Sequence, residues 1–177
     1  MKRFFSNFNT RLLIIHFVAF WLFMYGFEVL AFSHDYKFLY YGTQRVMRLN
    51  FPGRFEGDMN FIEQLGNIGL IVAYIISWAI SSKRNWHWIN CTVIFVVLFL
   101  LENLVVLKST YLHNVFLGAG GLFKVYNLWA HIVLGVVLLA IGVLLFFAKR
   151  IQRYISYDTQ KDKQKLKDAK RAARKGK

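Results

Sequence analysis

Six polar residues whose side chains could bind a ligand or take part in a reaction lie inside long apolar segments of this chain, each near one end of its segment. They are Glu28, Glu63, Asn67, Glu102, Asn127 and His131. An ionisable side chain at the centre of a membrane-spanning helix costs about 2.5–3.5 kcal/mol on insertion scales. Carboxyl groups in several such segments therefore favour a site with a function over a chance arrangement.

The depths of these residues can be compared from the rise of a helix, 1.5 Å per residue. Glu28, Asn67, Glu102 and His131 each lie about 6–9 Å from the same end of their segments. If the helices form a bundle in sequence order, we expect three carboxyl groups and an imidazole, those of Glu28, Glu63, Glu102 and His131, to converge on a cavity open to the outside. The pairs Glu63/Asn67 and Asn127/His131 are spaced i, i+4, so each pair shares a helix face.

Metal binding is one chemistry that this set could perform. Carboxylates and imidazole are ligands for divalent metals, and the possible ligands are Glu28, Glu63, Glu102 and His131. A di-iron bundle would need Glu-x-x-His on two helices, which the chain lacks. Haem is disfavoured because His16 and His131 are predicted at opposite faces of the membrane. No cofactor can be named from the sequence.

Two other interpretations stay open. Carboxyl groups a few ångströms apart can share protons, because like charges oppose each other's ionisation. Alternatively, the acids pair with Arg45, Arg48 or Arg54 from the first long connection, a purely structural role. The segment Gly118-Ala119-Gly120-Gly121 lacks the ending of a phosphate-binding loop and is interpreted as a hairpin tip.

Composition predicts an integral membrane protein. The 177 residues are 56% hydrophobic and 18% aromatic, with a mean hydropathy of +0.37; soluble domains are about 45–50% apolar. The net charge of +14 does not indicate nucleic-acid binding, because the basic residues concentrate after Ala148. Cys91 is the only cysteine, which excludes an intrachain disulfide or a cysteine metal cluster.

The elements that must position the polar residues are four apolar runs of about 20 residues or more, enough to cross a bilayer as helices. They are Leu12–Phe32, Phe61–Ser81, Trp88–Leu107 and Val125–Ala148. The predicted fold is an all-α, polytopic four-transmembrane-helix bundle over residues 1–148, followed by a basic tail over 149–177. Gly66, Gly69, Ala130 and Gly135 are predicted to permit close helix contact.

Orientation follows from the basic residues. With the N-terminus inside, seventeen Lys and Arg face the cytoplasm and six face outward, so the positive-inside rule predicts that both termini are cytoplasmic. A bacterial inner membrane is the simpler location. The ending Arg174–Lys177 also resembles a dibasic retrieval signal, which would matter only in a eukaryote. A cleaved signal peptide is the alternative for the first run, but the run exceeds the usual length and contains Glu28.

The tail has Lys or Arg at twelve of its 29 positions and is predicted to associate with anionic lipid at about 1 kcal/mol per basic group near the surface. The residues that we expect to bind lipid are Lys149, Arg150, Arg153, Lys170, Arg171 and Arg174.

The second and third runs resemble a known family. Ile62-Glu63-Gln64-Leu65-Gly66-Asn67-Ile68-Gly69, the basic turn Lys83-Arg84 and the run that follows are similar to the DoxX/MauE-type four-span membrane proteins, as is Arg11-Leu12-Leu13 before a run with Gly26. The resemblance covers roughly residues 11–107. The chain departs from it in its long first loop, in Glu28 and in its tail. The resemblance implies an accessory or quinone-linked subunit of a redox system, or a maturation factor.

Two functions follow as hypotheses. The first is a non-catalytic accessory or scaffold subunit of an inner-membrane complex, partnered by membrane lipid and by other subunits or a second copy. The second is a small carrier or membrane enzyme that binds a cation, a proton or a quinone at the outer-leaflet cluster. The chain carries no complete catalytic motif, which favours the first.

Overall fold

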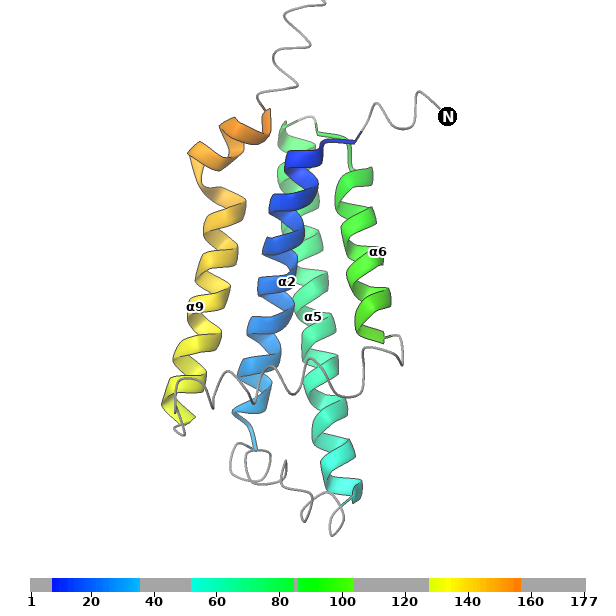
Figure 1. Cartoon of the computed structure of the whole chain (residues 1–177), viewed down its shortest axis with the longest axis vertical. Helices are drawn as coiled ribbons and strands as arrows, with labels where there is room; N and C mark the ends of the chain where they lie inside the picture. Colours follow the sequence, from blue (N-terminus) through cyan, green and yellow to red (C-terminus); the bar gives the residue numbers. More distant parts are fainter. Residues whose placement is uncertain (1–7, 36–51, 85, 104–127, 157–177) are drawn as a thin grey trace, which may run out of the picture.

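The computed structural model describes residues 8–35, 52–84, 86–103 and 128–156. Within these ranges the regular elements are helices, and no strand is present. The four main helices are α2 (Thr10–Phe32), α5 (Pro52–Arg84), α6 (Ile89–Asn103) and α9 (Leu128–Phe147). A short helix, Lys149–Ser156, follows α9 after a bend of 48°. Successive main helices run in opposite directions along one bundle (Figure 1).

Local sequence signals account for where the first two helices begin. The side chain of Asn9 accepts a hydrogen bond from the Leu12 backbone N–H at 3.1 Å, which caps α2 at its N-terminus. Pro52 occupies the first position of α5, where its fixed φ and missing N–H suit a helix start. The 33 residues of α5 give a length of about 50 Å at 1.5 Å per residue, so this helix extends beyond the predicted run 61–81 at both ends.

Two helices, α2 and α5, are long and apolar enough to cross a membrane, and a third candidate is the bent pair His131–Phe147 and Lys149–Ser156. The described part of α6 has 15 residues, fewer than the roughly 20 that a span needs. Residues 104–107 of the predicted third run and 125–127 of the fourth lie outside the described ranges. The all-helical class is confirmed, together with two or three helices that could span a membrane.

Helix α2 is the centre of the packing. It contacts α5 along one side and α9 along the other, α6 packs against α5 and α2, and α9 has little contact with α5. The helices α9 and α6 therefore flank the α2–α5 pair (Figure 1). The apolar core between them contains Phe20, Leu70, Leu98 and Phe146. Large apolar side chains also cover the outer surface, as expected where a helix surface faces lipid.

Glycines set the distances between the helices. A Cβ atom on Gly69 would lie 2.8 Å from the backbone oxygen of Phe23, so α5 approaches the α2 backbone directly. Between α2 and α9, a Cβ on Gly26 would lie 3.2 Å from Gly135 O, and a Cβ on Gly135 would lie 3.2 Å from Gly26 O. The predicted role of Gly66, Gly69 and Gly135 in close contacts is confirmed; the side chain of Ala130 lies outside the described residues.

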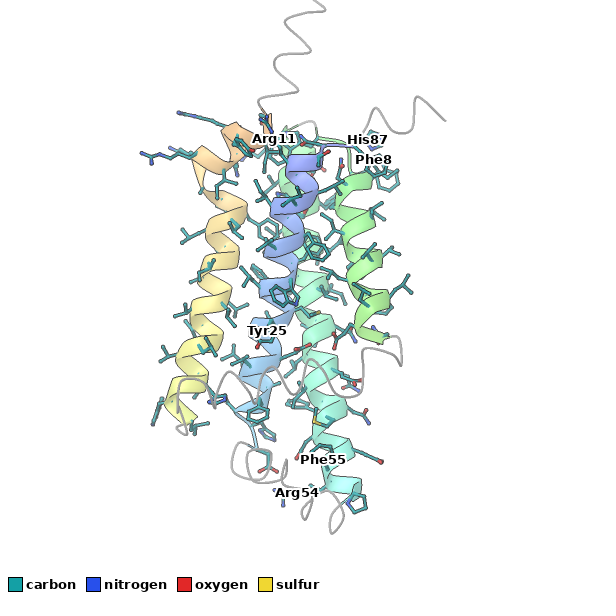
Figure 2. All side chains as sticks on the ribbon, viewed as in Figure 1. Phe8, Arg11, Tyr25, Arg54, Phe55 and His87 are labelled. Atoms are coloured by element: carbon teal, nitrogen blue, oxygen red, sulfur yellow. The ribbon has the colours of Figure 1, made fainter. Side chains whose placement is uncertain are left out.

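Charged residues separate to the two ends of the bundle. Figure 2 places Arg11 and His87 at one end and Arg54 and Phe55 at the other. We call the first the basic end, and its described basic residues are Arg11, Lys83, Arg84, Lys149, Arg150 and Arg153. We call the second the acidic end, because every acid in the described ranges lies on its side of the bundle; these acids are Glu28, Asp35, Glu56, Asp58, Glu63 and Glu102.

Candidate functional site

Three carboxyl side chains from three helices come together toward the acidic end. Glu28 of α2 and Glu102 of α6 are buried, with 4% and 8% of their surfaces exposed, and their carboxyl groups lie close enough to interact with each other. Glu63 of α5 is half-buried and close enough for its charge to act on Glu28. We call Glu28, Glu63 and Glu102 the carboxyl cluster.

Two neighbouring carboxyl groups can form a hydrogen bond only if one of them carries a proton, because an ionised carboxylate only accepts hydrogen bonds. The pair Glu28–Glu102 is therefore suited to hold a proton between α2 and α6. Tyr25 lies on α2, three residues before Glu28 (Figure 2).

Glycine in α5 makes room for the carboxyl group of Glu28. A Cβ atom on Gly66 would lie 2.6 Å from Glu28 Oε1 and 2.9 Å from Glu28 Cγ. Any larger residue at position 66 would occupy the volume in which the Glu28 side chain lies. Gly66 is thus part of the site as well as of the helix contact.

The predicted amide residues lie beside the cluster or outside the described ranges. Asn67 is half-buried, and its Oδ1 accepts a hydrogen bond from Asn103 Nδ2 at 3.3 Å. Asn103 Nδ2 also donates to Phe99 O at 2.8 Å. This bridge joins α5 to α6 next to Glu102. The predicted residue Asn127 lies outside the described ranges.

The imidazole of His131 is placed against α2. Its ring stacks on Phe32, with 5.5 Å between centroids and 19° between planes. Within the described residues, no group of three or more His, Cys, Asp or Glu side chains is arranged to hold a metal ion. The proposed ligand set Glu28, Glu63, Glu102 and His131 therefore has no support as a metal centre in this part of the chain.

The predicted pairing of an acid with an arginine is observed for Asp35, which is not a member of the carboxyl cluster. Arg54 Nε donates to Asp35 Oδ2 at 3.0 Å, and the two residues form an ion pair at the acidic end, beyond α2. Arg45 and Arg48 lie outside the described ranges. The observed ion pair thus involves an acid of the first connection and not a member of the carboxyl cluster.

A second buried polar group lies toward the basic end, and sequence reasoning did not pair its members. His16 Nδ1 and Ser77 Oγ form a hydrogen bond of 2.7 Å between α2 and α5, and both residues are fully buried. The rings of Trp86 and Phe146 make T-shaped contacts with the imidazole, with 6.0 and 5.0 Å between ring centroids. The sequence does contain one indication of this pair, because Ser77 lies at the same depth as His16 on the helix that follows. As predicted, His16 and His131 belong to opposite ends of the bundle.

Comparison of the chain with protein-family models, with curated proteins and with solved structures gives no match. The resemblance to DoxX/MauE-type proteins therefore stays a prediction. The carboxyl cluster and its surroundings are the basis for the function proposed below.

Proposed function

We propose that this chain is a four-span inner-membrane protein, with both termini in the cytoplasm, that binds a proton at the Glu28–Glu102 pair. The single observation that carries the proposal is the close approach of two buried carboxyl groups on different helices. A proton shared between them is the ligand that a hydrogen bond between two carboxyl groups requires.

The proposed topology is supported by the contact between the start of α2 and the end of the short helix Lys149–Ser156. Asn9 Nδ2 donates to Ile155 O at 3.0 Å, so the start of α2 and the end of the short helix lie together at the basic end. The turn between α5 and α6 carries Lys83 and Arg84 at the same end. Concentrated Lys and Arg favour the cytoplasmic side. The 20 residues of α9 suit a span, and the predicted continuation of α6 to Leu107 would give the fourth.

The energetic cost of the cluster supports a function over a structural role. Burying two carboxyl groups costs free energy that apolar side chains of similar size would not cost, because each polar group leaves water. Ionisable groups inside spanning helices are generally associated with proton or ion pathways. The third carboxyl, Glu63, is half-buried and offers a partner for proton exchange toward the acidic end.

A hydrophobic carbodiimide tests the proposal. This reagent enters the membrane and reacts with a protonated carboxyl group, which transfers its proton to the reagent nitrogen while its oxygen bonds to the central carbon. We expect mass spectrometry of the full-length protein in lipid to locate the adduct on Glu28 or Glu102. The exposed acid Glu56 on α5 is the matched control and should stay unmodified.

The variants E28Q, E102Q and E28Q/E102Q sharpen the test. We expect the double variant to lose the labelling in the membrane-embedded region. Labelling of Glu56 in preference to the pair, or labelling of the double variant at the original level, would contradict the proposal.

A second candidate, the accessory subunit, is favoured by the surface of α9. This helix packs mainly on α2, and large apolar residues such as Val133, Val136 and Leu144 are more than half exposed. Lipid, a partner helix or a second copy could cover that surface. Purification from native membranes in mild detergent distinguishes the candidates: stoichiometric partner proteins support the accessory role, and an isolated chain contradicts it.

A further inference from the structure

The short helix Lys149–Ser156 is fixed across the basic end of the bundle. It turns away from α9 by 48° and buries Gln152 and Ile155 against the other helices. Gln152 Nε2 donates to Phe146 O at 2.9 Å, and Arg84 at the end of α5 donates to Gln152 Oε1. These contacts give the helix a defined inner face and a defined height relative to the apolar spans.

Contacts from α2 hold the far end of the short helix. Arg11 donates to Tyr154 O at 3.2 Å, and its guanidinium carbon lies 4.4 Å from the centroid of the Tyr154 ring. Ile155 O accepts from Asn9 Nδ2 at 3.0 Å. Three helices therefore fix the orientation of this segment, which the sequence analysis assigned to the basic tail.

The outer face of the short helix is basic. Lys149, Arg150 and Arg153 are exposed, and Arg150 and Arg153 are spaced i, i+3, so they project from one face. No acid lies at the basic end within the described ranges. Tyr154 and Trp88, both 55% exposed, lie at this end as well, and such aromatic rings are enriched at the level of lipid headgroups.

We propose that Arg150 and Arg153 form a binding site for the phosphate of an anionic phospholipid in the leaflet at the basic end. The helix lies where the apolar spans end, with its apolar face against the bundle and its cations outward, as in interfacial helices. A guanidinium group binds phosphate oxygens in a bidentate manner. The site is local, in contrast to the screened attraction that a flexible basic tail exerts.

Native mass spectrometry of the full-length protein tests this proposal. Protein in a neutral detergent is incubated with phosphatidylglycerol or with phosphatidylcholine of the same chains, and the bound lipids are counted. The variant R150Q/R153Q removes two charges from the short helix, and K165Q/K167Q removes two charges from the tail after it as the matched control. R150K/R153K keeps the charge and loses the planar fork of each guanidinium.

We expect wild-type protein and K165Q/K167Q to retain phosphatidylglycerol at least fivefold better than R150Q/R153Q, with R150K/R153K between them. None of the proteins should prefer phosphatidylcholine. Thermal unfolding should be the same for all four proteins, because the substituted side chains are exposed. Equal loss in the helix and tail variants would overturn the proposal by showing diffuse attraction. Retention by R150Q/R153Q, or displacement of the lipid by equimolar inorganic phosphate, would overturn it too.

Discussion

The carboxyl group of Glu28 lies against Gly66, where a Cβ atom would stand 2.6 Å from Glu28 Oε1. Because of this contact, the distance between α2 and α5 sets the position of the Glu28 carboxyl group, which lies beside Glu102. The glycine therefore has a chemical role that can be separated from its role in helix packing.

The substitution G66A should disturb the carboxyl cluster more than it disturbs stability. The atoms in its way belong to the flexible Glu28 side chain, and alanine gains about 1 kcal/mol of helix propensity over glycine. We expect little change in thermal unfolding and a clear change in carbodiimide labelling of Glu28 and Glu102. Unchanged labelling would mean that Gly66 does not position Glu28.

The substitution G69A should have the opposite effect. Its new methyl group would meet backbone atoms of α2, with Phe23 O at 2.8 Å and Met24 Cα at 3.1 Å. Because backbone atoms can yield only if the helices separate, we expect a loss of about 1–3 kcal/mol, measured as reversible unfolding in detergent. The matched control is G57A, whose Cβ meets nothing within 4 Å and which should stabilise α5 slightly. Equal stability of G69A and G57A would contradict the close approach of α5 to α2.

The substitution S77A removes the partner of His16 Nδ1, which lies 2.7 Å from Ser77 Oγ. Leaving a buried polar atom unpaired costs about 1–3 kcal/mol, although interhelical hydrogen bonds in membranes average about 0.6 kcal/mol in double-mutant cycles. We expect a loss within these bounds. The exposed Ser82 on the same helix provides the control, and S82A should leave stability unchanged. A neutral S77A would show that the hydrogen bond contributes nothing.

The apolar runs predicted the helices well, because roughly 20 consecutive apolar residues leave little alternative to a helix. The first run, Leu12–Phe32, differs from α2 by two residues at its start and none at its end. The predicted equal depth of Glu28 and Glu102 in a membrane stays a prediction, although the two side chains lie close together in the bundle. Depth along a helix follows directly from residue number, so the sequence contains it.

Lateral neighbours could not be predicted in the same way. Helices that are apolar on all sides carry no stripe that distinguishes the packed face from the lipid face. The packing of α9 mainly on α2 and the stacking of His131 on Phe32 could therefore not be predicted from the sequence. The short helix Lys149–Ser156 was assigned to the tail because the segment after Ala148 has Lys or Arg at twelve of its 29 positions, although Ile151 and Ile155 are spaced i, i+4.

Reporter fusions test the proposed topology. Fusions after Lys177 and within Lys83–Arg84 should read cytoplasmic, and a fusion within Arg45–Arg54 should read external. The physical reason is the excess of Lys and Arg at the basic end. An external C-terminus would contradict the four-span count.

The most direct measurement of the shared proton is the infrared spectrum of the full-length protein in lipid at neutral pH. A protonated carboxyl group absorbs at a different frequency from a carboxylate, so a retained proton gives its own band. The proton-binding account predicts this band in the wild type and in the exposed-acid variant E56Q, and its loss in E28Q/E102Q. A wild-type spectrum without the band, or a band that persists in E28Q/E102Q, would contradict the account.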